Sequence, residues 1–324
     1  MRRSLIAMAA LMTVAAAVQA QDTAASWPAK PVRVVVPFPA SGATDLVART
    51  ITQRISQDLG QQMIVDNKPG AGGTIGAMEA AKAAPDGYTV LFTTSSTHSI
   101  SPHLMSKLSY NPVKDFTPVA HLADAASILL VTPSLPVKSV AELIQLAKQK
   151  PAQLNYASSG NGTIVHLNGA AFAAQAGIEL THVPYKGTSH SITDLAAGQV
   201  HMLFDSIPTG VPHVQSGRLK ALAVTGEKRS PLAPDVPTVS EAGLPGFTSV
   251  TWFGVYLPAG ASPALVERVN KAFTTAVKAP EVQESLRKNG LDVIQNSTPA
   301  QFDAMVKADS ARWGKLIKQL NISQ

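Results

Sequence analysis

Apolar and polar positions follow a repeating order of strand, loop and helix along this chain. The β-branched run Val32–Val36 lies between two prolines and predicts a strand. Apolar residues then recur every four positions from Val47 to Leu59, as one face of a helix requires, and Gly60 marks the end. The pattern next predicts a strand, a helix and another strand, over residues 63–65, 75–83 and 88–92. This alternation indicates parallel strands joined by crossover helices.

A second series of the same kind begins near Ile128. Ser139 and Glu142 form a capping box, which predicts a helix that runs to Lys150. Further strands, with helices between them, are expected at residues 154–157, 181–183, 202–204 and 221–224. The chain therefore contains two α/β series, one after the other.

The C-terminal part is predicted as one strand followed by helices. A proline-rich connection over residues 230–237 leads to the strand at 249–257, and helices are expected to start at Ser262 and Thr298. This part has too few elements to form a third domain, so we expect it to return to the first series. The predicted organisation is an α/β protein with a leader (1–20), a discontinuous first lobe (27–125 and 249–324) and a second lobe (126–248). Two such lobes usually meet at a ligand cleft.

The first 20 residues have the features of a secretory signal peptide. Arg2 and Arg3 precede an apolar run over residues 5–18, and small residues at 18 and 20 suit cleavage before Gln21. The run is shorter than the roughly 20 apolar residues that span a bilayer, which disfavours the alternative of a membrane anchor. A twin-arginine signal is a second alternative to the ordinary secretory route. No cysteine follows the cleavage site, so we expect a soluble periplasmic protein that is not lipidated.

Composition excludes several classes of function. The chain has no cysteine, which rules out disulfides, iron–sulfur clusters, thiolate zinc sites and cysteine nucleophiles. Removal of Arg2 and Arg3 with the leader leaves 25 basic against 21 acidic residues and lowers the formal charge from +6 to +4. This mild excess suits anionic ligands through long-range steering. The basic residues are scattered and only 5% of residues are aromatic, so nucleic acid is not an expected partner.

Three strand-to-helix loops are dense in Gly, Ser, Thr and Asn. They occupy residues 37–45, 93–98 and 157–163. Backbone N–H groups and hydroxyls at the start of a helix attract anions. Gly and Ser are also ordinary turn residues, so any one of these loops has a purely structural explanation. Three of them at equivalent positions in both halves favour a binding site.

Sequence signatures of catalysis, metal binding and dinucleotide binding are absent. Residues 70–76 are Gly-rich but lack the spacing of G-x-G-x-x-G and the lysine of a P-loop, so we interpret them as a tight turn with close backbone packing. No G-x-S-x-G elbow occurs. His98 and His103 are not part of an H-E-x-x-H motif. We therefore expect no cofactor and no metal, and we expect that the protein is not an enzyme.

A set of short segments recurs in a recognisable order along the chain. They are VVPFP (35–39), GATD (42–45), DNKPGAGG (66–73), APDGY (84–88), NYASSGNG (155–162), VPYKG (183–187), FD (204–205), DVPT (235–238) and EAGLP (241–245). In this order they resemble the extracytoplasmic receptors of tripartite tricarboxylate transporters, the Bug receptor family. The resemblance runs from Trp27 almost to the C-terminus.

The resemblance implies a type II periplasmic-binding-protein fold whose two lobes close over a small carboxylate, which is a di- or tricarboxylic, acidic amino or aromatic acid. It also implies transient contact with membrane transporter subunits, and we expect a monomer. From the first lobe it implies ligand contacts by Phe38, Ser41, Gly42, Ala43, Thr44, Asp45, Ser95, Ser96 and His98. From the second lobe it implies contacts by Ser158, Ser159, Asn161, Thr163, His166, Tyr185, Lys186 and Asp205.

Three of these residues carry alternatives. If Asp205 faces an anion, an amino group, a hydroxyl, a water or a proton must lie between them; otherwise it caps a loop or helix. Asp45 lies in the first turn of its helix and is interpreted as a local cap. Ser41 stands where the family motif normally has glycine. If this position needs a positive φ, serine is strained there; we expect instead that it does not, and that the hydroxyl is an added donor.

Two wider questions stay open from the sequence. A periplasmic sensor subunit that signals to a membrane kinase would use the same closure over a ligand, and it is the alternative to a transport receptor. Aromatic content is low, yet Phe38, Tyr185 and Trp252 could serve an aromatic acid.

Overall fold

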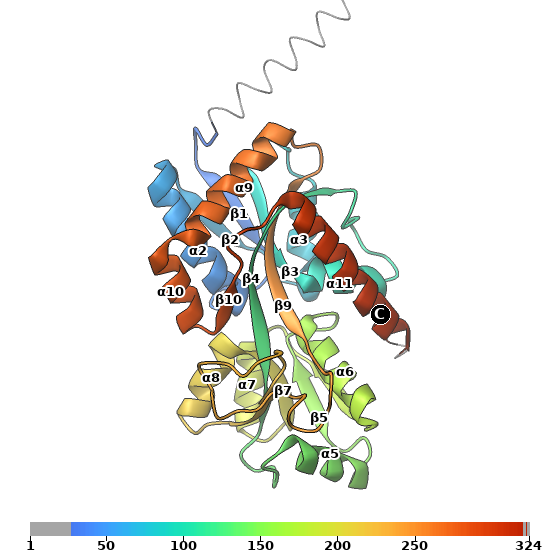
Figure 1. The fold of residues 1–324 in the computed structure, drawn as a ribbon. Helices are drawn as coiled ribbons and strands as arrows, with labels where there is room; N and C mark the ends of the chain where they lie inside the picture. The colour runs from blue at the N-terminus through green and yellow to red at the C-terminus, as the bar shows by residue number, and fades with distance from the viewer. Residues whose placement is uncertain (1–26, 320–321, 323–324) are drawn as a thin grey trace, which may run out of the picture.

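The computed structural model describes residues 27–319 and 322, and the predicted leader lies outside them. The chain forms two α/β lobes, one above the other in Figure 1. One sheet runs through both, with the strand order β2-β1-β3-β9-β4-β7-β5-β6, and β8 and β10 also pair with β4. None of the described helices is long and apolar enough to cross a membrane.

The first lobe contains the sheet's β2 end and the helices that cover it. Its strands are β1 (Val32–Val36), β2 (Met63–Asn67), β3 (Thr89–Thr94), β9 (Val250–Pro258), β10 (Leu291–Val293) and the first part of β4 (Phe116–Val131). Its helices are α2 (Ala43–Leu59), α3 (Thr74–Ala81), α4 (Ser101–Leu104), α9 (Pro263–Lys278), α10 (Pro280–Lys288) and α11 (Pro299–Gln319), with a 3-10 turn η1 (Ala71–Gly73) and a π-helical turn η2 (Ser96–Ile100). As predicted, β1 pairs in parallel with β2 and β3. Val34 of β1 and Ile51 of α2 lie in the same buried core.

The second lobe contains the other end of the sheet. Its strands are β5 (Asn155–Ser158), β6 (Thr181–Pro184), β7 (Met202–Ser206), β8 (Lys220–Val224) and the last part of β4. Its helices are α5 (Val140–Gln149), α6 (Ile164–Ala176), α7 (Thr188–Ala196) and α8 (Ile207–Gln215). β5 pairs in parallel with β6 and β7, while β4 is antiparallel to β7. The predicted capping box is confirmed, because the Ser139 hydroxyl accepts from the Glu142 N–H at 3.1 Å.

Two strands, β4 and β9, connect the lobes (Figure 1). β4 pairs with β9 as far as Ala126, which faces Val250, and from Ser127 onward it pairs with β7. Both crossings therefore lie at the same level of the sheet. We propose that residues 27–125 and 249–324 form the first lobe and residues 126–248 the second. The boundary lies where β4 stops pairing with β9 and starts pairing with β7.

A buried hydrogen-bond network joins the two crossings. The side-chain amide of Asn168, on α6, donates to the hydroxyl of Ser127 at 3.0 Å. Its oxygen accepts from the hydroxyl of Ser249, just before β9, at 2.6 Å. The Thr225 hydroxyl accepts from the Ser127 N–H at 2.8 Å and donates to the Ser249 carbonyl. All four residues are buried, so this network holds together the two strand crossings between the lobes, and we call it the hinge network.

Some elements differ from those predicted. β4 starts at Phe116 instead of near Ile128, because a register shift beside Pro118 lets the strand accommodate the proline. η2 and α4 were not predicted after β3. The helix that starts at Ser262 ends before Pro280, which lacks an N–H and begins α10 instead. The predicted helix start at Ser262 is confirmed, since its hydroxyl accepts from the N–H of Leu265 at 3.3 Å.

Candidate functional site

A cavity of about 390 Å³ lies between the two lobes. Its first-lobe wall is formed by the loop before α2, the end of β3 and two residues of β9. Its second-lobe wall is formed by the starts of α6, α7 and α8 and the end of β7. Ser127 of β4 also lines it, so the hinge network and the cavity share a residue.

Four helices begin at this cavity. The N-cap residues that line it are Gly42 of α2, Thr163 of α6, Gly187 of α7 and Ser206 of α8. Thr163 caps its own helix through the N–H of His166, whereas the other three N-caps make no side-chain cap hydrogen bond. The first N–H groups of a helix have no partner within it, and the aligned peptide dipoles give this end a positive potential. Each helix start therefore contributes a potential that favours a bound anion, although on α6 the N–H groups of Ile164 and His166 already donate to Ser96 and Thr163.

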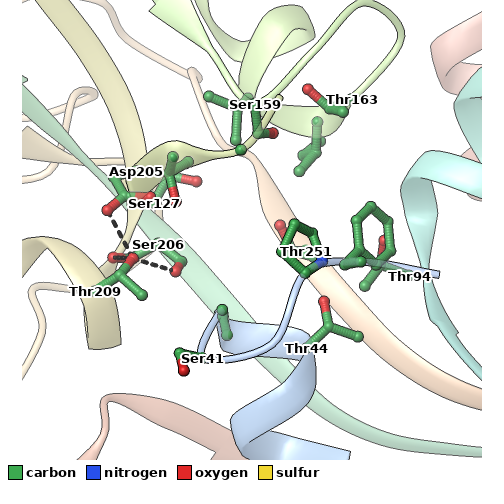
Figure 2. A pocket seen from close by; sticks show the side chains of 18 of the residues that line it. Ser41, Thr44, Thr94, Ser127, Ser159, Thr163, Asp205, Ser206, Thr209 and Thr251 are labelled. Carbon is green, nitrogen blue, oxygen red and sulfur yellow. Dashed lines mark hydrogen bonds between the residues drawn. The ribbon is translucent and has the colours of Figure 1, made fainter. Parts of the chain in front are cut away.

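Hydroxyl groups supply most of the polar lining. Figure 2 shows Ser41 and Thr44 at the start of α2 on one side and Ser159 and Thr163 on the other. Among the described lining residues there is no lysine or arginine, and Asp205 and His213 are the titratable side chains. An anion in this cavity is thus held by neutral donors and helix ends.

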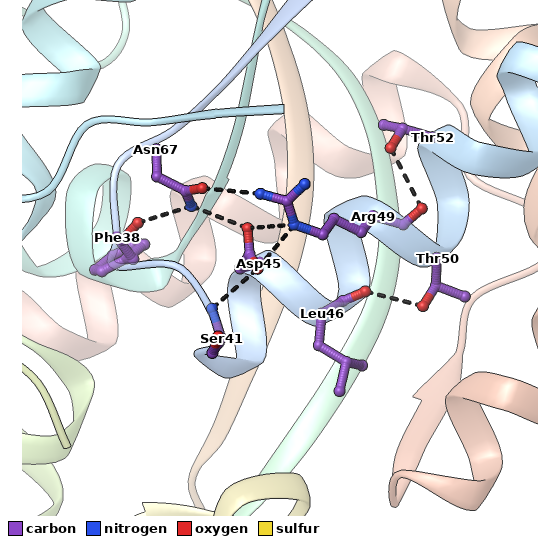
Figure 3. Close-up of polar contacts among 8 residues, drawn as sticks. All are labelled: Phe38, Ser41, Asp45, Leu46, Arg49, Thr50, Thr52 and Asn67. Atoms are coloured by element: carbon purple, nitrogen blue, oxygen red, sulfur yellow. Dashed lines mark hydrogen bonds and ion pairs between the residues drawn. The ribbon is translucent and has the colours of Figure 1, made fainter. Parts of the chain in front are cut away.

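The first loop is fastened by Asp45, which does not line the cavity. Its carboxylate accepts from the Ser41 N–H, from Nε of Arg49 and from Nδ2 of Asn67, each at 3.0 Å (Figure 3). Asn67 also donates to the carbonyl of Phe38 at 3.0 Å. Burial raises the pKa of Asp45, but these hydrogen bonds, with that of Arg49 foremost, lower it overall. Asp45 is therefore a local cap that shapes the loop.

Ser41 adopts a φ of 64°, in the left-handed region. The expectation that this position does not need a positive φ was wrong. The backbone turns here so that the Ser41 N–H reaches Asp45. The strain that serine carries in this conformation is of the order of 1–2 kcal/mol. Ser41 is one of the residues that line the cavity, and a role of its hydroxyl as an added donor stays a prediction.

Asp205 lies at the C-terminal end of β7 and lines the cavity while only 1% exposed. The hydroxyl of Thr209 donates to its carboxylate at 2.6 Å (Figure 2). The Ser206 N–H and the Thr188 hydroxyl also bond to it. Burial raises the pKa of Asp205 to about 6, although these hydrogen bonds oppose the shift. At neutral pH the cavity therefore contains a buried negative charge.

The structure divides the predicted ligand residues into two groups. Those that line the cavity are Phe38, Ser41, Gly42, Ala43, Thr44, Ser96, Ser159, Thr163 and Asp205. Those that do not line it are Asp45, Ser95, His98, Ser158, Asn161, His166, Tyr185 and Lys186.

In the first lobe the residues away from the cavity are buried behind it. The His98 ring stacks on that of Tyr256 with centroids 4.0 Å apart, and burial lowers the pKa of His98 to about 3. Its Nδ1 lies 2.9 Å from the hydroxyl of Thr97. The Ser95 hydroxyl is buried without a hydrogen-bond partner among the described residues. These two side chains belong to the layer that supports the end of β3.

In the second lobe the corresponding residues have local partners. The Ser158 hydroxyl lies 2.7 Å from Nε2 of His182, whose ring stacks on that of His166 with centroids 3.9 Å apart. Tyr185 donates to the carboxylate of Asp194 at 2.7 Å. Asn161 and Lys186 are exposed. Polar composition of these loops therefore did not distinguish the side chains at the cavity from those that hold the loop together.

Several lining residues were not predicted. They are Pro39, Ala40, Thr94, Ser127, Ile164, Val165, Gly187, Thr188, Ile192, Ser206, Thr209, Pro212, His213, Thr251 and Phe253. Ser206 did carry a signal, because a serine followed two residues later by Pro208 is typical of a helix start. Ser127 and Thr251 carried none, since both lie within strands and reach the cavity only because those strands cross between the lobes.

The remaining predictions concern aromatic, glycine and metal-binding residues. Phe38 lines the cavity, whereas Trp252 does not and donates from Nε1 to Asp309 at 2.9 Å. Residues 70–76 contain the predicted tight turn: Gly72 has a φ of 66°, and a Cβ there would lie 2.8 Å from the carbonyl oxygen of Asn161 in the facing lobe. Within the part of the chain that the structure describes, no cluster of three or more His, Asp or Glu could hold a metal ion.

Several known proteins resemble this chain in both sequence and fold. The chain is 32% identical to BugT of Bordetella pertussis over 97% of each chain. It is 37% identical to Rpa4515 of R. palustris, solved with adipate, with a TM-score of 0.87 over 92% of this chain and 99% of that one. It is 35% identical to MatC from Rhodopseudomonas palustris, solved with bound malate, with a TM-score of 0.84 over 90% of this chain and 100% of that one.

A family model extends this agreement. The model of the tripartite tricarboxylate transporter family receptor matches residues 47–322, which include most of α2, both crossing strands and the second-lobe helices α5 to α8. The two-lobed fold is likewise that of the periplasmic binding protein BugD, at a TM-score of 0.86 and 34% identity. This chain therefore belongs to the tripartite tricarboxylate transporter receptor family.

Proposed function

We propose that this protein is a periplasmic receptor that binds a small carboxylate between its lobes and delivers it to the membrane subunits of a tripartite tricarboxylate-type transporter. The observation that carries the proposal is the meeting of four helix N-termini at one cavity. Such helix ends bind a carboxylate through their N–H groups and their dipoles. The basic and apolar leader over residues 1–20 supports export to the periplasm.

Cavity size and lining favour a short aliphatic acid. A volume of about 390 Å³ suits a small molecule that the closed lobes surround. The cavity has apolar lining from Phe38, Ile164 and Phe253 as well as hydroxyl groups. This mixture suits a carbon chain with a polar group at each end. Relatives of this chain have been solved with adipate and with malate, and both acids have this form.

Calorimetric titration of the refolded, ligand-free protein with short aliphatic acids tests the binding half of the proposal. Thr44 lines the cavity at the start of α2, so Thr44→Val should weaken binding about tenfold through the loss of one hydrogen bond to a charged group. Thr50→Val is the matched control, because the Thr50 hydroxyl on the same helix bonds to the Leu46 carbonyl at 2.9 Å. Absence of binding by every acid, or equal effects of the two variants, would contradict a carboxylate site at this helix start.

Uptake measurements test the second part of the proposal, delivery of the ligand to a transporter. Deletion of the gene should abolish cellular uptake of the acid that the purified protein binds, and expression of the Thr44→Val variant should restore uptake only when the acid is supplied at a higher concentration. Unchanged uptake in the deletion strain would leave the binding result standing and refute the transport role.

A further inference from the structure

The cavity contains a charge that a simple carboxylate receptor would not need. Asp205 is only 1% exposed, yet it is one of the residues that line the space in which we place an anionic ligand. A second negative charge beside it at neutral pH would be repelled, because a buried charge is screened much less than an exposed one. The chemistry of Asp205 therefore restricts which carboxylates the site accepts.

Burial disfavours the ionised form of Asp205, but its hydrogen-bond partners favour it. Its identified partners are all donors: the Thr209 hydroxyl at 2.6 Å, the Thr188 hydroxyl and the Ser206 N–H. It also lies just before the N-terminus of α8, where the helix dipole favours negative charge. An ionised carboxylate accepts about four hydrogen bonds, so three donors leave it able to accept one more from the cavity. Burial raises its pKa only to about 6, so the ionised form dominates at neutral pH.

The neighbouring elements offer no cation to balance this charge. On α8 the titratable side chain at the cavity is His213, and burial and the charge of Arg218 lower its pKa. On α7, His190 and Asp194 do not line the cavity. Three uncharged residues line the cavity from the other elements: Ser127 of β4, Ser159 just after β5, and Ser41 in the loop before α2. Among the described residues, the charge of Asp205 is thus left for the ligand to satisfy.

We propose that Asp205 selects carboxylates that carry a hydrogen-bond donor, an ammonium or a hydroxyl group, at the end that faces β7. The donor points at the Asp205 carboxylate, while the ligand's carboxylate lies at the N-terminus of α2. A dicarboxylate without such a donor binds only when a proton is taken up between its second carboxylate and Asp205. This inference rests on the proposed function and narrows its ligand class to amino and hydroxy acids.

A matched series of acids tests the inference. Succinate, malate and aspartate share one carbon skeleton and differ in a hydrogen, a hydroxyl or an ammonium group at one carbon. Glutarate, 2-hydroxyglutarate and glutamate repeat the comparison on a longer chain. In calorimetric titrations at pH 7.5, the best donor-bearing acid should bind at least about tenfold more tightly than its parent, as expected for a hydrogen bond to a charged group. A parent acid that binds as tightly as both of its derivatives overturns the inference.

Proton uptake gives an independent measurement on the wild-type protein. Titrations in two buffers of different ionisation enthalpy should show about one proton taken up with succinate or glutarate and none with the donor-bearing acids. Binding of a parent acid without proton uptake overturns the inference, even though it would still support a carboxylate receptor. If no acid of either series binds, the proposed function and this inference fail together, which distinguishes that result from the others.

Two variants assign the preference to Asp205. Asp205→Asn keeps the shape and removes the charge, so the affinity ratio between a donor-bearing acid and its parent should fall to within about threefold and the proton uptake should disappear. Asp45→Asn is the matched control, because Asp45 is also a buried aspartate but bonds to Ser41, Arg49 and Asn67 and does not line the cavity. It should preserve the ratio even if overall affinity drops. A ratio that survives in a folded Asp205→Asn protein overturns the assignment, and the wild-type titrations test the inference without either variant.

Discussion

The backbone N–H of Ile164, at the start of α6, donates a hydrogen bond of 3.2 Å to the side-chain hydroxyl of Ser96, in η2 of the other lobe. Both residues line the cavity, and the bond joins the two lobes at its wall. Such a bond exists only while the lobes are together, so it stabilises the closed form and not either lobe alone.

Ser96→Ala should therefore weaken ligand binding by favouring the open form. The loss of one hydrogen bond, about 1 kcal/mol, corresponds to roughly a fivefold higher Kd. Scattering or a distance probe across the lobes should show a larger open fraction without ligand. Ser99→Ala is the control, because the buried Ser99 hydroxyl in the same turn has no hydrogen-bond partner among the described residues. Equal Kd values for the two variants would show that the bond does not contribute to closure.

The left-handed conformation of Ser41 gives a second prediction. Ser41→Gly should raise the free energy of unfolding by up to about 1 kcal/mol, because glycine adopts a φ of 64° without a steric cost. Ser41→Val should lower it, since a β-branched side chain is poorly tolerated there. Denaturant unfolding of the three proteins measures both changes. A glycine variant less stable than wild type would mean that the serine hydroxyl stabilises the loop by more than its strain costs.

Loss of the Asn168 amide from the hinge network should lower the free energy of unfolding by more than the Ser41 substitutions change it. Asn168→Leu keeps the side-chain size but leaves the hydroxyls of Ser127 and Ser249 without their partner. The free energy of unfolding should fall by about 2–4 kcal/mol, as expected when buried polar groups lose hydrogen bonds. Thermal and denaturant unfolding measure the change. Gln175→Leu is a control on the same helix, because its amide bonds at the surface to the Pro245 carbonyl, and it should change stability by less than about 1 kcal/mol.

Asp205 predicts an unusual dependence of stability on pH. Its pKa is about 6 in the folded protein against an ordinary 3.8, so the folded state holds the proton more tightly than the unfolded state. Its contribution is complete below about pH 4 and is lost as pH rises through 6. The shift of about two units corresponds to roughly 3 kcal/mol. Asp205→Asn should therefore gain stability relative to wild type between pH 4 and 6.5, measured by denaturant unfolding without ligand.

Asp45 is a control, because its contribution to stability should change with pH in the opposite direction to that of Asp205. Its pKa is lowered in the folded protein, so its contribution is present at neutral pH and lost as pH falls below about 4. Asp45→Asn should therefore be less stable than wild type at pH 7, with the difference shrinking in acid. If both variants showed the same trend with pH, the two carboxylates would not differ in environment as described.

Much of the fold could be predicted because local signals agreed with the final structure. The β-branched run of β1, the four-residue spacing of α2 and the serine caps of α5 and α9 all specify their elements without help from distant residues. β4 could not be predicted in full, because its alanines and Pro118 have low strand preference. Pairing with β9 in the first lobe and with β7 in the second holds this segment extended. Both partners are distant in the sequence, so the residues of β4 alone do not indicate them.

The site was predictable at the level of loops and much less at the level of side chains. Ser158 and Ser159 are adjacent in one loop, yet Ser159 lines the cavity while Ser158 lies against His182. His98 has the chemistry of a ligand residue but is stacked in the core. Which neighbour turns outward depends on backbone dihedrals and packing across the lobes, and residue type alone does not contain this information.

The crossing of β4 and β9 also sets the order in which the lobes can be completed as an exported chain emerges from its N-terminus. The strand pairs of the second lobe all form among residues 127–224, so they can form before the rest of the chain has emerged. β3 pairs with β1 on one side and with β9 on the other, and β9 emerges only after the second lobe is complete. The lobe that begins the chain is thus the last to be finished. Until then β3 has an open edge, and an unpaired edge is where an unfinished chain can pair with a neighbour.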